Sequence, residues 1–393
     1  MGLQTSETLK LTEQELEAVT ALRHDLHRHP ELSGEEFRTT EKIQKFLSEI
    51  SGCEILELPI KTGLVTRIAG NDPALEVMLR ADIDALPQTE QTEIPWRSQS
   101  PGIMHACGHD LHTASLCGAA LLLGRPARNG SLRPTVDLVF QPAEEVTTGA
   151  ATLINAGLFD RIHPQICFGL HNWPSVETGR IVCREGALMA AKRNFDILIR
   201  GVGGHGSKPH LNIDPIVCAA AVVQSLQTVI SRNTDPLDAA ILSINMIQGG
   251  SPVNLVVDKV LLKATVRALS DTVLERNIDR VMTIVAKTAE AYECQSEIRW
   301  QEHIPAVWNA PDLTVIARRC AEKTGCELTD AQPSLASEDF SMYRAFVPSF
   351  FFWVGSRAAG NPIEELHTPR FCADDLAIRT SAELYAACAS VFD

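Results

Sequence analysis

The sequence predicts an α/β protein, in which a sheet with helices on its faces is interrupted by a smaller α+β domain. The first observation is that short apolar runs alternate with segments of helical periodicity, as in folds where strands and helices follow one another. The apolar runs lie at 77–80, 135–140 and 166–170, and the helical segments at 111–123 and 149–156. The second observation is that this pattern changes near Lys192.

Two helices are expected at the start of the chain. Thr12 and Glu15 have the spacing of a capping box, and the apolar periodicity behind them predicts a helix that His29-Pro30 ends. Ser33 to Glu36 repeats the capping signal ahead of a second helical pattern, which ends at Ser51-Gly52.

The changed pattern predicts an inserted domain at 189–302, between main-domain segments 1–188 and 303–393. An apolar residue occupies every second position from Val260 to Val266, which indicates a sheet buried mainly on one face. Helix and strand candidates of the main domain resume at 311–323 and 350–354. The elements expected in the insertion are a strand at 194–201, a glycine-rich loop at 201–207, a helix at 214–230, strands at 241–247 and 259–268, a helix at 271–292 and a strand near Ile298.

Composition and charge restrict the class of protein. The 393 residues are 45% hydrophobic and 21% charged, which excludes a disordered chain and the composition of a membrane protein. The formal charge of −14 and the pI of about 5.4 work against attraction to nucleic acid or anionic lipid, so neither is expected as a partner. No apolar stretch reaches the roughly 20 residues that cross a bilayer.

Cysteine usage predicts a cytoplasmic protein. The 11 cysteines include no CxxC spacing, and residues 1–10 lack the apolar core of a signal peptide. We therefore expect free thiols in a reducing compartment.

The densest group of chemically active side chains is the segment from His105 to His112. Within it, Cys107 and His109 could both reach one metal ion from an irregular backbone. A thiolate and an imidazole suit Zn, Mn, Co or Ni better than Mg or Ca. An ordinary polar loop, or a cysteine nucleophile, is the alternative interpretation of these residues.

A second group, Glu144 and Glu145, comes shortly after the apolar run 135–140. The end of a strand is a usual place for site residues in α/β sheets. One carboxylate could bind metal while its neighbour deprotonates the attacking water. A solvated acidic turn would contain the same residues.

Four further candidates lie near the ends of predicted elements. His171 follows an apolar run, and His367 lies just before the last helical segment. Asp82 and Asp84 end another run, and either could orient a metal-bound histidine through its free ring nitrogen. Structural histidines and strand-capping aspartates are the alternatives. Convergence favours a site, because the strand ends of one sheet gather at one edge.

Seven segments, taken together, resemble the M20 metallopeptidase family. The resemblance is strongest to its amidohydrolase branch, which includes aminoacylases, hippurate hydrolases and hydrolases of indole-acetic acid conjugates. It extends in order from about residue 20 to the end of the chain. The segments are 24–31, 80–87, 104–112, 141–145, 169–172, 203–207 and 366–369.

The resemblance implies a two-metal catalytic domain with a mixed sheet flanked by helices, and an inserted lid or dimerisation domain. Glu144 would be the general base, and Asp84 would orient a metal ligand by hydrogen bonding without binding the metal itself. Many M20 peptidases have a carboxylate as the bridging ligand and a histidine before the aspartate of the early strand motif, whereas here Cys107 and Asp82 occupy these places, as in the amidohydrolase branch. The implied ligands of two divalent ions (Mn, Zn, Co or Ni) are Cys107 as the bridge, with His109, Glu145, His171 and His367.

For the inserted domain, the resemblance implies that His205 reaches the active site of the partner subunit and stabilises the oxyanion of the tetrahedral intermediate. Asn254 and Arg267 are similar to residues that hold the substrate carboxylate, although an exposed strand arginine would equally explain Arg267. The segment 337–340 resembles one near the substrate pocket, and no role is assigned to it.

The expected function is metal-dependent hydrolysis of a small N-acyl amino acid, with an acetyl, benzoyl or similar acyl group, to a carboxylic acid and a free amino acid. The expected partners are this substrate and further copies of the chain, as a homodimer or higher homo-oligomer. The alternatives are a dipeptidase and a catalytically silent metal-binding dimer.

Overall fold

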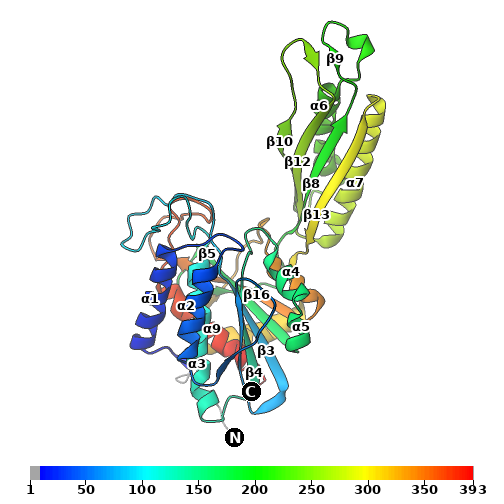
Figure 1. Cartoon of the computed structure of the whole chain (residues 1–393). Coiled ribbons are helices and arrows are strands. Elements are labelled where there is room, and N and C mark those ends of the chain that lie inside the picture. The colour runs from blue at the N-terminus through cyan, green and yellow to red at the C-terminus, as the bar shows by residue number, and fades with distance from the viewer. Residues whose placement is uncertain (1–8, 393) are drawn as a thin grey trace. The chain divides into compact units, whose positions relative to one another are not determined.

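The structure is a computed structural model that describes residues 9–392, and this part of the chain divides into two compact units (Figure 1). Unit 1 contains the chain up to Gly186, Trp308–Ala331 and the chain from Asp339 onward. Unit 2 contains Ala187–Val307 and Gln332–Glu338. The insertion expected from the sequence, 189–302, did not include the segment 332–338, which belongs to unit 2 in the structure. The chain passes between the units within β7 (Gly186–Met189), within β14 (Val307–Asn309), and on either side of the segment 332–338.

Unit 1 is built on an eight-stranded sheet in the order β1-β2-β4-β3-β5-β16-β6-β15. At its centre, β3 (Asp72–Asp82) is parallel to β4 (Pro134–Gln141) and to β5 (Ile166–Glu177). β16 (Ser349–Arg357) is parallel to β5, whereas β2 pairs antiparallel with β1 and β4, and β6 pairs antiparallel with β16 and parallel with β15, so the sheet is mixed as expected. The other strands are β1 (Cys53–Ile55), β2 (Leu64–Ile68), β6 (Arg180–Val182) and β15 (Glu327–Thr329).

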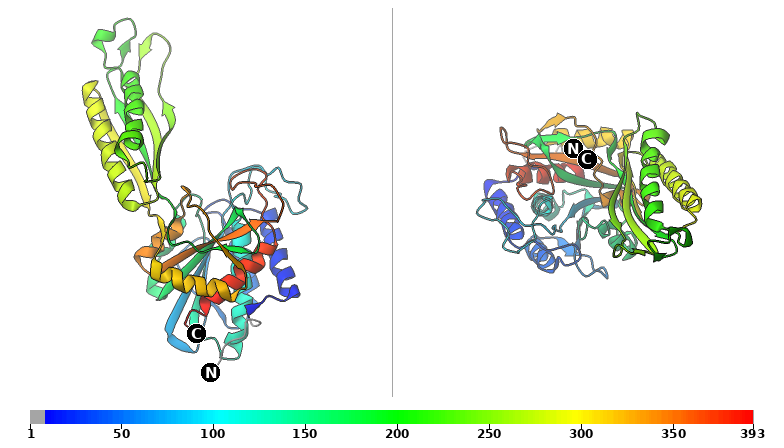
Figure 2. Two further views of the ribbon diagram at one scale, coloured as in Figure 1. Left: turned by 180° about the vertical axis from the view of Figure 1, so that it is seen from behind. Right: turned by 90° about the horizontal axis from the view of Figure 1, so that it is seen from above.

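Helices cover both faces of this sheet, which is why its central strands are continuous apolar runs. One face packs in the main apolar core against α1, α2, α3, α8 and α9, and Figure 2 shows α8 and α9 side by side. The other face contacts α4 and the 3-10 helix Asp339–Ala345. The helix bounds are α1 (Glu13–Arg28), α2 (Phe37–Ser48), α3 (His109–Arg128), α4 (Gly149–Asn155), α5 (Leu158–Arg161), α8 (Pro311–Lys323) and α9 (Leu376–Ala389).

The parallel pairing brings the carboxyl ends of β3, β4 and β5 to one edge of the sheet. Asp82 is paired with Gln141 at the ends of β3 and β4, and β5 runs alongside β3 in the same direction. Asp84 and Glu144 therefore follow neighbouring strand ends, whereas His171 lies within β5, which continues to Glu177, two residues beyond its last pairing with β3.

Unit 2 is a four-stranded antiparallel sheet with α6 (Pro215–Asn233) and α7 (Asp271–Ala291) packed on one face (Figure 1). Its strand order is β10 (Ala240–Gln248), β12 (Lys259–Ala268), β8 (Ala191–Arg200) and β13 (Gln295–Ile304). Beyond the end of this sheet, β9 (Gly204–His205) pairs with β11 (Leu255–Val256), where the sequence indicated only a glycine-rich loop. A 3-10 turn (Pro209–Leu211) follows β9.

The sequence analysis found no apolar stretch long enough to cross a bilayer. By length and composition alone, however, α6 is long and apolar enough to cross a membrane. Its buried side chains include Cys218, Val222 and Leu226, which lie in the apolar core of unit 2. Packing against the sheet thus accounts for its apolar face.

The two predicted capping signals have different outcomes. Thr12 forms a capping box, because the Glu15 amide donates to its hydroxyl at 3.2 Å and its own amide donates to the Glu15 carboxylate at 2.9 Å. The expectation at Ser33 was wrong, because α2 begins at Phe37 and its N-cap, Glu36, makes no side-chain cap bond. The Ser33 hydroxyl instead donates to Asp84 at 2.6 Å.

Candidate metal centre

The loop that enters α3 positions the first two candidate ligands. Gly108, the N-cap of α3, has a φ of +84°, a left-handed conformation that a Cβ disfavours. A Cβ at this position would also lie 2.4 Å from the side-chain amide of Asn172. Glycine therefore permits the tight turn between Cys107 and His109, both of which are buried.

Five side chains from four segments of unit 1, those of Cys107, His109, Glu145, His171 and His367, converge around the Cys107 sulfur. The Nε2 atoms of His171 and His367 each lie 3.3 Å from Cys107 Sγ. Glu145 Oε1 lies 3.4 Å from His367 Nε2 and 3.9 Å from His109 Nε2. Two of the groups whose ligand atoms lie within 4.8 Å of one another contain Cys107, one with His109 and His171 and the other with Glu145 and His367. The groups share Cys107, as two metal ions bridged by one sulfur would require.

The donor atoms fit a pair of divalent metal ions. His109 Nε2 and Glu145 Oε1 are buried without a hydrogen-bond partner among the described residues, a costly arrangement that a cation between them would relieve. The ring of His171 donates through Nδ1 to the Asn172 carbonyl at 2.6 Å, which leaves the Nε2 lone pair facing Cys107. Sulfur, imidazole and carboxylate together suit Zn, Mn, Co or Ni.

Burial shifts the pKa of two of the candidate ligands, Cys107 and His171. Burial and the nearby Glu145 carboxylate raise the pKa of the Cys107 thiol well above its ordinary value. Burial also lowers the pKa of His171 well below its ordinary value, so that imidazole is neutral. A thiolate at Cys107 thus requires a cation beside it, which argues against Cys107 as an unaided nucleophile.

Glu144 lies against the cluster on a strained turn. Its buried carboxylate is within 4.8 Å of the ligand atoms of His109 and Glu145. The preceding residue, Ala143, has a φ of +55°, which is uncommon for a residue with a Cβ. The buried carboxylate of Glu36 stabilises this turn by accepting a hydrogen bond from the Ala143 amide at 2.9 Å.

Asp84 supports two of the candidate ligands at once. One carboxylate oxygen is 3.1 Å from His109 Nδ1, and the other accepts from the Glu145 amide at 3.0 Å and from the Ser33 hydroxyl. Burial alone would raise the pKa of Asp84, but these hydrogen bonds outweigh it and hold the pKa below its ordinary value. The ionised carboxylate fixes the ring of His109 with Nε2 toward the cluster.

His112 and Asn172, to which the sequence analysis assigned no role, connect the α3 loop to β5. His112 Nδ1 is 2.6 Å from the Asp82 carboxylate, and its Nε2 accepts from the Asn172 amide at 2.8 Å. The Asn172 side chain donates to the Cys107 carbonyl at 2.6 Å. The signal for His112 was its place one helical turn after His109, whereas no spacing marks Asn172.

A buried arginine holds Asp82 in turn. Arg80 donates to Asp82 at 2.7 Å and to Asp339 at 3.0 Å. Asp339 belongs to the segment 337–340 that the sequence left without a role, and it also accepts from Gln141 at 2.7 Å. Asp339 therefore connects the ends of β3 and β4 through hydrogen bonds on the face opposite the main core.

A second buried network lies behind the α3 loop. His27 on α1 is 2.9 Å from Asp110 through Nδ1 and 3.2 Å from Glu90 through Nε2. Burial alone would lower the pKa of His27, but the Asp110 and Glu90 carboxylates raise it to about 9. His27 is thus a buried cation at neutral pH that joins α1 to the residue after His109.

The remaining sequence candidates lie in unit 2, at two ends of its sheet. His205 on β9 and Asn254 beside β11 lie together, because these two strands pair. Arg267 lies at the opposite end of β12, where its guanidinium donates to the Leu335 carbonyl at 2.8 Å. The ten residues of β12 extend about 30 Å. One small substrate therefore cannot contact His205 and Arg267 of the same chain.

Comparison with known proteins identifies relatives over nearly the whole chain. The family model described as "Peptidase family M20/M25/M40" matches residues 78–390 of this chain. An N-acetylcysteine deacetylase of Bacillus subtilis (strain 168) is 38% identical over 366 residues, which are 93% of this chain and 94% of the relative. An N-acetyldiaminopimelate deacetylase of Anoxybacillus flavithermus is 34% identical and covers 85% of this chain and 88% of its own. A solved Bacillus subtilis structure, described as a dinuclear metal binding peptidase from the M20 family, has a TM-score of 0.84 and 35% identity, and the match covers 97% of this chain and 99% of that one.

The fold and the site define a metal-dependent hydrolase of amide bonds, with a catalytic unit and a lid unit. The chain belongs to peptidase family M20/M25/M40. The family resemblance and the α/β fold class expected from the sequence are thereby confirmed.

Replacing Asp84 with asparagine should weaken metal binding without removing a candidate ligand. Asparagine keeps the shape but loses the charge that fixes the His109 ring, so we expect about 10- to 100-fold lower affinity for a divalent metal. Competition with a chromophoric chelator measures this affinity. Asp72→Asn, at the far end of β3, is the matched control. Equal affinities in the two variants would contradict the role of Asp84.

Replacing His27 with glutamine should reduce stability at neutral pH and have little effect at high pH. The folded-state pKa of about 9 lies above the ordinary 6.5, so the stabilisation is complete below pH 6.5 and is lost as pH rises through 9. We expect the free energy of unfolding to fall by about 3 kcal/mol at pH 6. Urea unfolding over a pH series measures this difference, and a loss that stays constant to pH 10 would assign the effect to packing.

Proposed function

We propose that this protein hydrolyses small N-acyl amino acids, N-acetyl amino acids foremost, to a carboxylic acid and a free amino acid. The relatives that cover most of the chain include N-acetylcysteine and N-acetyldiaminopimelate deacetylases, which act on acetylated amino acids. We place the reaction in the cytoplasm, and the 11 free cysteines support a reducing compartment.

One observation supports this proposal most directly: the Glu144 carboxylate lies beside the candidate metal ligands but is not one of them. Glu145 lies in the metal-ligand cluster, and Glu144, the next residue along the chain, reaches the same space without being needed as a ligand. Hydrolysis by a metal-bound water requires a base of this kind beside the metal.

The residues that would hold two divalent ions are Cys107 between them, with His109, Glu145, His171 and His367. When bound, the ions would lower the pKa of water and polarise the scissile carbonyl. The donor set allows Mn, Zn, Co or Ni, and competition among these ions in the assay would rank them.

Glu144 would move the protons of the reaction. Its carboxylate would accept a proton from the attacking water, and then donate this proton to the leaving amine nitrogen, so that the amino acid departs as a neutral amine. The Glu36 hydrogen bond to the Ala143 amide holds the turn that aims Glu144 at the cluster. Preorganisation of this kind keeps the base within reach of water.

Unit 2 would complete the site across a homodimer. His205 would donate to the developing oxyanion, and Asn254 and Arg267 would bind the substrate carboxylate. His205 and Arg267 lie near opposite ends of β12, whose ten residues extend about 30 Å. One small substrate cannot contact both in one chain, so we assign His205 with Asn254 to the site of the partner subunit.

The surface at the His205 end of unit 2 supports this arrangement. Large apolar side chains are exposed there on the loops around β9 and β11. Exposed apolar groups in this density mark interaction surfaces, and a second copy of the chain would cover them in a two-fold dimer. They are Val202, Leu211, Val253 and Leu255.

The test of function is primary-amine release from N-acetyl, N-benzoyl and indole-acetyl amino acids and from dipeptides, with Mn(II) added. Release from the acylated amino acids, abolished by a chelator, is the expected result. Release from dipeptides alone would make the protein a dipeptidase, an outcome that the peptidase description of its solved relative also allows. Activity that survives chelation would contradict the metal-dependent proposal.

Glu144→Gln should abolish turnover while leaving the metal in place. Glutamine fills the same space but cannot accept a proton from water, so we expect kcat to fall by about 10²- to 10⁴-fold. Metal content by plasma emission spectrometry should equal that of the wild type. Glu185→Gln, a glutamate of unit 1 outside the cluster, is the control. Turnover retained in Glu144→Gln would refute the base assignment.

Two inactive variants should restore activity in one another if His205 acts across subunits. Glu144→Gln and His205→Ala are each expected to be inactive as homodimers. In a mixed dimer, the subunit with intact Glu144 receives an intact His205 from its partner, so a randomly mixed preparation should recover about a quarter of wild-type activity. Co-expression with two affinity tags isolates the mixed dimer, and its inactivity would place His205 in its own subunit or outside the site.

A further inference from the structure

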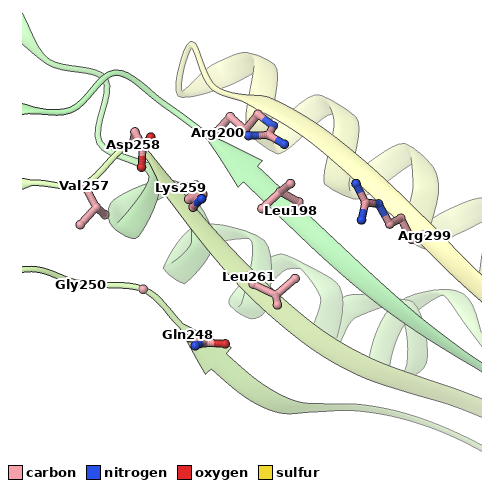
Figure 3. A pocket seen from close by; sticks show the side chains of 10 residues that line it. Leu198, Arg200, Gln248, Gly250, Val257, Asp258, Lys259, Leu261 and Arg299 are labelled. Atoms are coloured by element: carbon pink, nitrogen blue, oxygen red, sulfur yellow. The ribbon is translucent and has the colours of Figure 1, made fainter.

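Unit 2 contains a hollow that involves none of the residues assigned so far. It lies on the open face of the four-stranded sheet, and α6 and α7 lie behind the sheet in Figure 3. Its volume is about 690 Å³, within the range of small-molecule sites. Residues from all four strands line it, so its shape is set by the sheet. We call it the basic hollow, because Arg200, Lys259 and Arg299 line it.

Two of its cations face each other directly. Arg200 on β8 and Lys259 on β12 are paired residues in the antiparallel register, and both are exposed. Like charges at directly opposite positions repel one another and weaken strand pairing. Among residues 9–392, neither side chain has an ion-pair partner.

Two other cations of the open face lie close to a carboxylate. Lys263, two rows further along β12, lies 4.0 Å from the Asp196 carboxylate on β8. Arg299 on β13 is 2.7 Å from the Glu297 carboxylate on its own strand. Within the basic hollow, Arg200 and Lys259 are therefore the opposed cations without an ion-pair partner among the described residues.

The floor of the basic hollow is apolar. Leu198 and Leu261 form the paired row next to Arg200 and Lys259, and both are half-buried (Figure 3). Asp258 is the one carboxylate of the lining. Three cations, one carboxylate and two leucines thus line a hollow in a chain whose net charge is −14. This combination favours a ligand with a dianionic group at one end and an apolar body at the other.

We propose that the basic hollow binds a small molecule that carries a phosphate monoester on an apolar body. A phosphate monoester has a charge of about −1.5 to −2 at neutral pH. The guanidinium of Arg200 would bind two phosphate oxygens and Lys259 would supply a point charge, which removes the repulsion between them. The apolar body would cover Leu198 and Leu261. This site lies in unit 2 alone and does not depend on the proposed hydrolase activity.

Isothermal titration calorimetry of the full-length, metal-loaded protein at low ionic strength tests the proposal with three probes. Phenyl phosphate should bind saturably in the basic hollow, inorganic phosphate should bind more weakly because it lacks the apolar body, and benzoate should bind weakest because it has a single charge. The double variant Arg200→Gln, Lys259→Gln should lose at least about tenfold in phenyl phosphate affinity at this site. Amine release from the acylated amino acids should stay unchanged in this variant.

Lys263→Gln is the matched control, because it removes a cation from the same face whose charge Asp196 already compensates. Phosphate bound at the metal centre contributes equally to both variants, so the difference between their isotherms reports the basic hollow. Identical isotherms for the wild type and the double variant would overturn the proposal. An equal loss in Lys263→Gln would also overturn it, because non-specific attraction to a basic sheet face would then explain the binding.

Discussion

The parallel pairing of β3 with β4 and β5 is the constraint on which the rest of unit 1 depends. It brings the ends of β3 and β4 and the adjoining part of β5 to one edge of a sheet whose faces are both covered, so polar side chains gather at this edge. Asp84 follows the end of β3, Glu144 and Glu145 follow the end of β4, and His171 lies within β5, two residues beyond its last pairing with β3. The other candidate ligands come from the start of α3 and from the loop of His367, whose φ of +62° and hydrogen bond from its amide to Ala106 fix its position beside Cys107.

Burying the polar side chains of the candidate metal centre costs free energy, and the surrounding hydrogen bonds show how these side chains are held in place. Several candidate ligands are held by further polar groups that are themselves hydrogen-bonded. Asp84 orients His109, while His112 and Asn172 connect β5 to the Cys107 loop. Arg80 then joins Asp82 to Asp339 on the far face of the sheet. The buried polar atoms without a hydrogen-bond partner include His109 Nε2 and Glu145 Oε1, and these two face the place where a cation fits.

The functions that we propose for unit 2 divide along the length of one strand. One end of β12 carries Arg267, and the other end lies beside His205, Asn254 and the exposed apolar loops. On the open face of the sheet, Lys263 lies beside Asp196, whereas Arg200 and Lys259 oppose each other without an ion-pair partner among the described residues. The same ten-residue strand thus separates His205 from Arg267 and lines the basic hollow.

The sequence by itself determined the fold class, the family and the identity of most candidate site residues, because these depend on local signals. Apolar runs of strand length, a capping box at Thr12, and the short spacings of Cys107 with His109 and Glu144 with Glu145 are all readable along the chain. Tertiary structure alone decided what Ser33, Glu36, His112 and Asn172 do, since their partners lie far away in sequence. Ser33 and Glu36 have the spacing of a helix cap, yet a buried hydrogen bond to a distant strand end or turn replaced the local one. The opposition of Arg200 and Lys259 likewise follows from strand register, which no local pattern specifies.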